Sequence, residues 1–531
     1  LPLSTELTLP LMKDPLVSVQ FDGSETDKIS YSDVWQGGQP LPFQESRIIY
    51  ASLTSAKRLT SSEAVKEAWE LEFELPVNCR SEVNIKPGDS FGFLCVNRLA
   101  EVNYVIERLG VLDSQMVSVA HSKKARNMEH LPKQPLTVRR LLTTCCDVRG
   151  IPKKIFLRTL AEYTSDTIEK RRLLELSSRE GSKDYIRYIL EARNTYLDVL
   201  KAFCSCKPPL AVLLEHLPRL LPRYYSVCNW LPEKEDIIPH RFKILYKRCP
   251  IPGSNEEGLC TGWLTELAEK WSAERDLVSG LSSLSLNEVH WQKVPVYLRK
   301  NTTFRFPESL NVPVIMIGPG SGVAPFLSYL QWRREAILQS DKADISETWL
   351  FTGCRHRHLD FLYEDELKQL LMQGALLKLI VSFSRDVECR NGADKSEDAS
   401  KREEDKASGT SGDVGIDSKP CVKETVPALK VVRTQEWKMK ENDSGVSNWI
   451  SGGKYVQDSM RLWHHDIARL ISLPDSCVYV CGDAVSMATS VRDTVVEILV
   501  DEGTVATKED GVTFVKELQK QGRYMEDIWT A

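Results

Sequence analysis

The C-terminal segment RYMEDIWTA places a carboxylate and a large aromatic ring close together. Asp527 precedes Trp529 by two positions, in what we expect to be the last strand of the chain. Side chains two apart on a strand point to the same side, so both groups can enter one site. A single tryptophan near the end of a chain is more often an ordinary packing residue, and the pair alone leaves both interpretations open.

The tetrapeptide RYYS, at 223–226, combines a cation, two aromatic rings and a hydroxyl. Strand alternation sends Arg223 and Tyr225 to one side. This composition suits FAD: Arg223 would neutralise its diphosphate, Tyr225 would stack on its ring system, and the Ser226 hydroxyl would bond near the hydride-accepting nitrogen. As a bare tetrapeptide, the pattern is more often a barrel edge.

Two glycine-rich stretches are suited to bind phosphate. In GPGSGVAPF, Gly318 to Phe326, glycines let backbone amides approach a dinucleotide diphosphate, and the next helix presents its positive end. In GLCTGWL, Gly258 to Leu264, we expect Thr261 to cap a helix whose free amides face a second diphosphate. A glycine-rich turn taken alone is as often only a tight packing contact.

Two motifs flank a long polar stretch and supply cations. SFSRD ends a predicted strand at 386, and KYVQD begins at 454. We expect Ser384, Arg385 and Lys454 to hold an adenosine 2′-phosphate at the carboxyl edge of a parallel sheet, with Tyr455 packed nearby, which favours NADPH over NADH. The alternative is a solvated pair of surface cations.

Cys481 ends an apolar strand in YVCGDA, where an α/β sheet would offer it to a ligand. A buried thiol is more often inert, and its position does not decide between the two interpretations.

The elements that position these residues follow from periodicity. Turn-bounded apolar runs predict an antiparallel FAD-binding barrel over 46–96 and 222–306, split by a helical connecting domain over 97–221. Alternating strands and helices predict an NADPH-binding α/β domain with a parallel sheet over 307–531. The fold class is therefore multidomain, α+β and α/β. Residues 1–45 read as a flexible linker, and 387–450 as a disordered loop.

Composition excludes several classes. A net charge of -5 gives no overall reason to expect nucleic acid or an anionic membrane, and no apolar run approaches the roughly 20 residues of a membrane span. The fourteen cysteines lack zinc spacing or a dense secreted framework, so we expect no metal site, reduced thiols and a cytoplasmic protein.

In their order and spacing, the motifs resemble the FAD/NADPH portion of the diflavin reductases, from about residue 50 to the end. They are PGDSFGFLC, RYYS, GLCTGWL, GPGSGVAPF, FTGCRHRHLDFLYEDEL, SFSRD, KYVQD, YVCGDA and RYMEDIWTA. Stretches from 151 and 206 look most like the branch that reduces the cobalamin of methionine synthase. The resemblance implies FAD and NADPH as cofactors, and methionine synthase as partner through an FMN flavodoxin-like domain whose phosphate loop we do not find before the linker.

The resemblance also implies residue roles. A hydride-transfer cluster is formed by Ser226, Cys481, Asp527 and Trp529, and Trp529 covers the flavin and swings away for nicotinamide. FAD contacts fall on Arg223, Tyr224, Tyr225, Ser226, Gly258, Leu259, Cys260, Thr261 and Trp529. NADPH contacts fall on Gly320, Ser321, Ser384, Arg385, Lys454, Tyr455, Val456 and Gln457.

One departure from the family bears on function. In the helix after CGDA the family usually has a basic residue and an Asp near the nicotinamide nucleotide, where this chain has Val485 and Ser490. Two alternatives therefore stand beside a cobalamin-directed reductase: the reductase half of another diflavin enzyme, such as a microsomal cytochrome reductase, and a non-catalytic flavoprotein scaffold.

Overall fold

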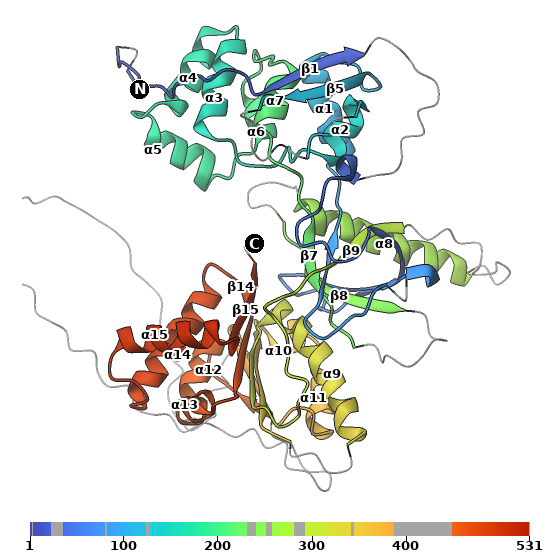
Figure 1. The fold of residues 1–531 in the computed structure, drawn as a ribbon, viewed down its shortest axis with the longest axis vertical. Coiled ribbons are helices and arrows are strands. Elements are labelled where there is room, and N and C mark those ends of the chain that lie inside the picture. Colours follow the sequence, from blue (N-terminus) through green and yellow to red (C-terminus); the bar gives the residue numbers. More distant parts are fainter. Residues whose placement is uncertain are drawn as a thin grey trace, which may run out of the picture.

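The computed structural model describes residues 1–2, 4–22, 35–79, 82–123, 128, 130–132, 134–230, 240–250, 257–280, 293–340, 345–386 and 449–529. Its elements form three bodies, a helical body, a barrel and a C-terminal α/β body, which follow one another down the long axis in Figure 1. Each has its own buried apolar core. The fold class expected from periodicity is confirmed.

The helical body forms because apolar residues recur every three or four positions. Leu157, Leu160, Leu213 and Leu214 are almost fully buried in its core, as the spacing predicts. Its helices are α1 (Leu99–Leu109), α2 (Val138–Thr144), α3 (Lys154–Leu160), α4 (Thr167–Ser177), α5 (Ser182–Tyr185), α6 (Tyr196–Ala202) and α7 (Leu210–His216).

The linker predicted for residues 1–45 is wrong for much of its length. Strand β1 (Val17–Asp22) pairs antiparallel along all six residues with β5 (Met116–His121), which also pairs with β6 (Leu136–Thr137). Further on, Gln36 is buried and donates to the carbonyls of Thr144 and Leu220. Proline and glycine content suggested a tether, but the pairing partner lies about a hundred residues away in the sequence.

The barrel consists of six antiparallel strands in the order β7-β4-β9-β2-β3-β8. A bridge between Val227 and Ile244 connects the two outer strands, β7 and β8, and closes the sheet on itself. Helix α8 (Leu259–Gly280) packs on it. The strands are β2 (Ile49–Arg58), β3 (Ala68–Glu74), β4 (Ser90–Phe93), β7 (Arg223–Ser226), β8 (Arg241–Lys247) and β9 (Lys293–Arg299).

The C-terminal body is a six-stranded parallel sheet in the order β13-β12-β11-β10-β14-β15. Its strands are β10 (Val314–Ile317), β11 (Thr348–Cys354), β12 (Lys378–Phe383), β13 (Trp449–Ser451), β14 (Cys477–Asp483) and β15 (Tyr524–Trp529). Both faces are apolar because helices cover both: Val314 and Met316 pack on one side, Ile315 and Ile317 on the other.

Helices α9 (Ala324–Leu338) and α11 (Glu364–Met372), with the short α10 (Arg357–Asp360), lie on one side of this sheet. The other side carries α12 (Val456–Leu462), α13 (His464–Ser472), α14 (Met487–Asp501) and α15 (Lys508–Lys520). The helix expected directly after CGDA begins only at Met487, because Asp483 accepts hydrogen bonds from the amide and hydroxyl of Ser486 and holds a turn.

The disordered loop expected at 387–450 lies almost wholly outside the described residues. Its last two residues do not belong to a loop, since Trp449 and Ile450 begin β13 and pair with β12.

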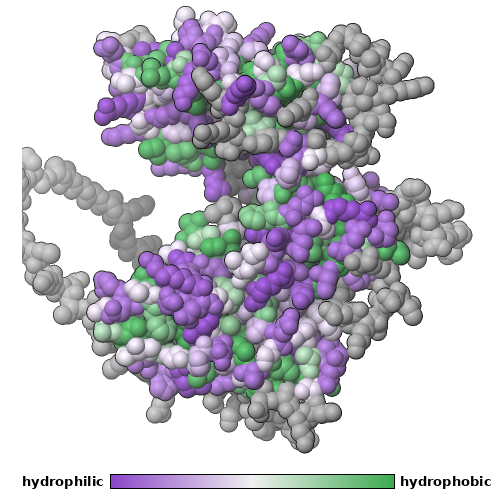
Figure 2. All heavy atoms as spheres, viewed as in Figure 1, coloured by the Kyte–Doolittle hydropathy of each residue, from purple (hydrophilic) through white to green (hydrophobic). Residues whose placement is uncertain are grey.

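Figure 2 shows hydrophilic residues over most of the visible face, with hydrophobic ones scattered among them. Among the described residues no helix is long and apolar enough to cross a membrane. The cysteines of this part of the chain are free, and no group of three or more His, Cys, Asp or Glu side chains in it could hold a metal ion.

Candidate active site

The barrel and the C-terminal body meet through a hydrogen bond between residues 301 positions apart. Ser226, the last residue of β7, donates from Oγ to Oδ2 of Asp527 in β15 at 2.8 Å. Cys481 is the register partner of Asp527 on β14. Three members of the predicted hydride-transfer cluster are therefore brought together at the carboxyl end of the parallel sheet, where open α/β sheets bind ligands.

A third polar side chain belongs to this junction. Arg299, at the end of β9, places Nη1 3.8 Å from Oδ1 of Asp527, and its guanidinium lies 4.6 Å from the centroid of the Tyr224 ring. Its Nε is buried without a hydrogen-bond partner in the described part of the chain. Sequence reasoning missed Arg299, because a basic residue at the end of a strand carries no motif. Its position beside Asp527 is visible only in the fold.

The environment of Asp527 opposes its ionisation. Burial raises the pKa of this carboxyl above its ordinary value, although the hydrogen bond from Ser226 and the charge of Arg299 act in the opposite direction. The side chain retains 21% exposure. The junction therefore holds a carboxyl group whose proton affinity is increased, next to a hydroxyl that can relay a proton.

Cys481 is completely buried in the core of the C-terminal body. Burial, together with the charge of Asp527, raises the pKa of its thiol well above the ordinary value, so the thiol is neutral at physiological pH. A role in hydride transfer would require the thiol itself, not a thiolate, and remains a prediction.

Trp529 is the last described residue of β15 and is 40% exposed. Its carbonyl accepts a hydrogen bond from the amide of Ala484 at 2.9 Å, which fixes the backbone of the strand end. The indole ring makes no ring contact or hydrogen bond with another described residue. An anchored backbone with an uncommitted ring is compatible with the expected flavin cover, which remains a prediction.

The other face of β7 carries Arg223 and Tyr225, as strand alternation predicts. The ring of Tyr225 packs edge-on against Phe93 at a centroid distance of 5.3 Å, and Arg223 Nη2 lies 3.7 Å from Oδ2 of Asp147. Tyr224 faces the junction and its hydroxyl donates to the carbonyl of Pro42 at 2.9 Å. The four residues of RYYS thus divide between two faces of one strand.

The first turn of α8 supplies backbone amides rather than side chains. Leu259 and Cys260 are buried in the barrel core, so only their N–H groups can meet a ligand. The prediction that Thr261 caps this helix is wrong: the helix begins at Leu259, and Thr261 Oγ1 is buried without a hydrogen-bond partner in the described residues. The free amides behind Gly258 and this hydroxyl fit a diphosphate.

The glycine-rich turn after β10 is tightly packed. A Cβ at Gly318 would lie 2.4 Å from the carbonyl oxygen of Gly322, and one at Gly322 would lie 2.1 Å from that of Cys481. Gly320 has a φ of +59°, which disfavours other residues. Both explanations of these glycines therefore hold here: they allow close packing, and they bring Ser321 and the amides of the turn beside the end of β14.

The predicted 2′-phosphate site lies at the end of β12. Arg385, Lys454 and Tyr455 are exposed, and Lys454 Nζ lies 5.6 Å from the centroid of the Tyr455 ring. Neither cation has an ion pair with a carboxylate of the described residues. Ser384 is bonded to the carbonyl of Cys354.

Two predicted NADPH contacts follow in α12. The side chain of Val456 is buried in the core, so it can offer only its backbone, whereas Gln457 in the first turn is half-buried. The expectation that Val485 lies in the helix after CGDA is wrong: it lies in the turn before α14 and is 71% exposed, so this position presents an open surface without a basic side chain.

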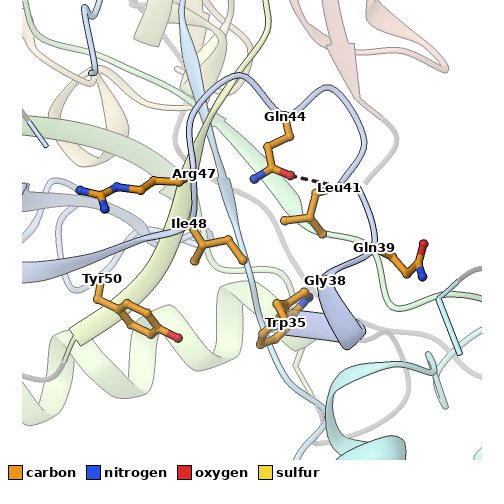
Figure 3. A pocket seen from close by; sticks show the side chains of 8 residues that line it. All are labelled: Trp35, Gly38, Gln39, Leu41, Gln44, Arg47, Ile48 and Tyr50. Carbon is orange, nitrogen blue, oxygen red and sulfur yellow. Dashed lines mark hydrogen bonds between the residues drawn. The ribbon is translucent and has the colours of Figure 1, made fainter. Parts of the chain in front are cut away.

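A separate cavity of about 330 Å³ lies between the segment before β2 and the start of that strand (Figure 3). It is lined by Trp35, Gly38, Gln39, Leu41, Gln44, Arg47, Ile48 and Tyr50. None of the predicted site residues lines it. The polar side chains at the junction, Ser226, Asp527 and Arg299, do not line it either.

Comparison with known proteins agrees with this arrangement. Residues 41–263 match the family model described as FAD binding domain, and residues 316–405 match the one described as oxidoreductase NAD-binding domain. The chain is 33% identical over 495 residues to methionine synthase reductase of Bos taurus and 32% identical over 494 residues to that of Homo sapiens, covering 91% of this chain and 61% of each relative.

The NADPH–cytochrome P450 reductase of Sus scrofa is 28% identical over 494 residues, covering 93% of this chain and 60% of the relative. The chain thus spans about 60% of the length of these relatives. The two domain matches and the fold lead to one conclusion: the chain is an oxidoreductase with an FAD-binding domain and a domain that binds a nicotinamide dinucleotide, and it is similar to methionine synthase reductases and NADPH–cytochrome P450 reductases.

Proposed function

We propose that this chain takes hydride from NADPH onto FAD and sends the electrons, through an FMN flavodoxin-like domain outside the chain, to the cobalamin of methionine synthase. Such a transfer would restore the active cofactor of that enzyme. The similarity to methionine synthase reductases of several mammals supports this acceptor over others. FAD supplies the chemistry of accepting two electrons at once and releasing them singly.

The observation that carries the proposal is the hydrogen bond from Ser226 to Asp527. It joins the strand that carries the flavin-binding motif to the strand that carries the predicted flavin cover. A hydride can move only when donor and acceptor are held close together, and a bond between the two bodies at this point fixes that distance. Asp527 would orient the nicotinamide and hold a proton on Oδ1 or Oδ2, and Ser226 would position the accepting ring.

The remaining residues bind and align the two dinucleotides. Arg223 and the first-turn amides of α8 would hold the diphosphate of FAD, with Tyr225 beside its ring. Ser321 would contact the diphosphate of NADPH, and Arg385 with Lys454 its 2′-phosphate. The exposure of both cations supports this, since a ligand can reach them without breaking an existing ion pair.

We further propose that the protein acts in the cytoplasm. Its free cysteines, most of them buried, are compatible with a reducing compartment. Fractionation of cells that express the whole protein, followed by immunodetection, would test the compartment directly.

The experiment that tests the proposal uses the purified chain. It should be yellow with one bound FAD and should reduce ferricyanide with NADPH much faster than with NADH. Rapid mixing with NADPH should bleach the flavin absorbance. A colourless protein that cannot be reconstituted with FAD would refute the proposal at its first step.

Two alternatives remain, each tied to an observation. The similarity to NADPH–cytochrome P450 reductases keeps a cytochrome-directed reductase in view, and electron-acceptor assays with an added FMN domain from each kind of relative would separate the two acceptors. Val485 and Ser490 keep a non-catalytic flavoprotein in view, and that alternative requires the flavin to stay oxidised in the rapid-mixing experiment.

A further inference from the structure

Lys247, the last residue of β8, lies where the barrel meets the C-terminal body. Leu245, two positions earlier on the same face, is buried in one cluster with Val323 and Phe326, which follow the glycine-rich turn. Lys247 reaches that turn directly: a Cβ at Gly320 would lie 2.1 Å from Lys247 Nζ. The ammonium group of a barrel lysine therefore rests on the backbone of the turn that the sequence assigns to a dinucleotide diphosphate.

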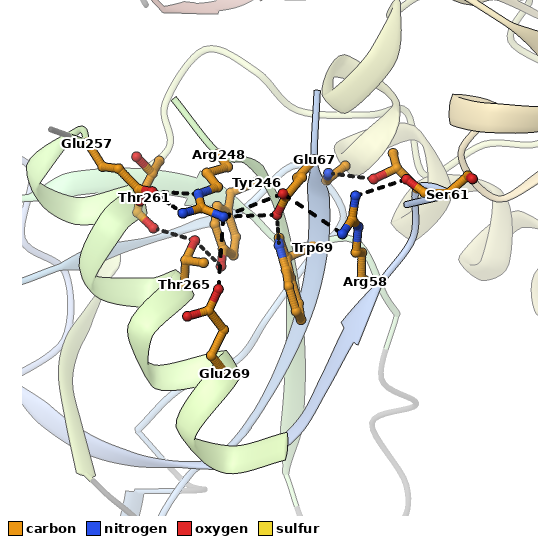
Figure 4. Close-up of polar contacts among 12 residues, drawn as sticks. Arg58, Ser61, Glu67, Trp69, Tyr246, Arg248, Glu257, Thr261, Thr265 and Glu269 are labelled. Atoms are coloured by element: carbon orange, nitrogen blue, oxygen red, sulfur yellow. Dashed lines mark hydrogen bonds and ion pairs between the residues drawn. The ribbon is translucent and has the colours of Figure 1, made fainter. Parts of the chain in front are cut away.

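The neighbouring cations of β8 are paired with carboxylates, and Lys247 is not. Arg241 lies 3.0 Å from Glu74, and Lys243 Nζ lies 3.1 Å from Oε1 of Glu70. The next residue, Arg248, is surrounded by Glu67, Glu257 and Glu269, as Figure 4 shows. The register partner of Lys247 on β3 is Ala68, which offers no charge. Within the described part of the chain, Lys247 Nζ has neither a hydrogen bond nor an ion pair.

The groups around Lys247 affect its charge in both directions. Burial is the largest cause that lowers the pKa of Lys247, and the charges of Lys66 and Arg355 act in the same direction, whereas Asp360 and Cys249 act against them. The carboxylate of Asp360 is already engaged, because it accepts the backbone amides of Arg355 at 3.3 Å and His356 at 2.7 Å. A half-buried ammonium group without a hydrogen bond or ion pair is costly to keep charged, and a bound anion would offset that cost.

We infer that Lys247 binds the diphosphate of the nicotinamide dinucleotide from the barrel side, opposite the amides of the turn at Gly320. The inference rests on the proposed function and adds a ligand contact to it. In this arrangement Arg385 and Lys454, at the end of β12, bind the 2′-phosphate. Because the diphosphate is common to NADPH and NADH, Lys247 strengthens the binding of both and does not choose between them.

The test measures binding without any hydride step. The FAD-loaded chain is titrated by calorimetry with NADP⁺ and with adenosine 2′-monophosphate, which carries the 2′-phosphate but no diphosphate. Lys247→Gln should raise the Kd for NADP⁺ about tenfold, as expected for one lost charge-assisted contact, and leave that for adenosine 2′-monophosphate unchanged. Arg385→Ala should weaken both ligands.

Control variants separate this contact from general effects. Lys247→Arg should retain most of the affinity for NADP⁺, and Lys66→Gln, which removes an exposed neighbouring charge, should change it by less than about twofold. The FAD content of Lys247→Gln should equal that of the wild-type chain.

Three outcomes would overturn the inference alone. They are an unchanged Kd for NADP⁺ in Lys247→Gln, an equal loss of affinity for both ligands, and a loss of FAD, which would assign the lysine to the other diphosphate. A wild-type chain that binds FAD but not NADP⁺ would overturn the proposed function together with this inference.

Discussion

Polar groups are arranged differently in two regions of the molecule. One is the junction at Asp527, and the other, called the corner below, is the pair Arg385 and Lys454 at the end of β12. At the junction, Asp527 contacts both Ser226 and Arg299, and all three residues are partly buried. At the corner, Arg385 and Lys454 are exposed and have no carboxylate partner among the described residues. The contacts of the junction are formed without a ligand, so we expect them to fix the geometry of hydride transfer. The two cations of the corner have no partner until an anion binds, so we expect them to provide affinity for that anion.

This difference predicts which kinetic constant each region controls. A preorganised network acts on the transition state, so damage to it lowers the rate of flavin reduction. Free surface cations act on the bound substrate, so their loss raises KM or Kd.

The largest effect is expected from Asp527→Asn. The amide can still accept a hydrogen bond from Ser226, but it lacks the charge that faces Arg299 and cannot hold a proton. We expect the rate of flavin reduction by NADPH to fall about a hundredfold with KM changed much less, as measured by rapid mixing. Asp501→Asn, at the exposed end of α14, is the matched control. A normal rate in Asp527→Asn would remove the junction from the mechanism.

The next effect concerns the corner. The double variant Arg385→Ala, Lys454→Ala should raise KM for NADPH about thirtyfold and leave kcat and the KM for NADH nearly unchanged, because NADH has no 2′-phosphate to lose. Arg461→Ala removes a cation of α12 that is already paired with Glu497 and should have little effect. Parallel losses for NADPH and NADH would show that these cations do not bind the 2′-phosphate.

We propose that Trp529 connects the two regions, because in its predicted role as flavin cover the ring leaves before nicotinamide enters. Trp529→Ala should increase the use of NADH relative to NADPH by about tenfold, since the nicotinamide no longer has to displace an indole ring. The ratio of kcat/KM for the two coenzymes measures this effect. Trp529→Phe, which keeps an aromatic cover, should lie close to the wild type. An unchanged ratio in Trp529→Ala would argue against gating.

Sequence reasoning predicted the fold class correctly because it depends on local patterns, and the cofactor roles of the site motifs stay predictions. The apolar run from Val314 to Ile317 and the spacing of Leu210 to Leu217 indicate their elements directly. Element boundaries were less accurate, since Thr261 lies inside α8 and not before it. Strand β1 was missed because its partner β5 is distant in sequence, and Pro and Gly around it suggested a tether.

Arg299 and Lys247 could not be found in this way. Each is one basic residue at the end of a strand, and its importance comes from partners that the fold supplies, Asp527 for Arg299 and the turn at Gly320 for Lys247. The sequence shows which residue types are present, but the unpaired or paired state of a charge is a property of the tertiary structure.

The smallest effect compares the two regions through stability. The pKa of Asp527 is raised in the folded chain, so between the ordinary and the raised value the unfolded chain releases its proton first, and stability falls as pH increases. Asp527→Asn cannot ionise and should escape this loss. Its Tm should match the wild type below about pH 4, where both chains are uncharged at this position, and should exceed it by a few degrees at pH 7. Scanning calorimetry of the two proteins at several pH values measures the difference.

Arg385→Ala should show no comparable pH-dependent gain, because its exposed cation is not desolvated in the fold. A variant that is slower and more stable at neutral pH would mean that the junction maintains a buried charge for catalysis at a cost in stability; equal Tm values throughout would mean that Ser226 and Arg299 compensate its burial completely.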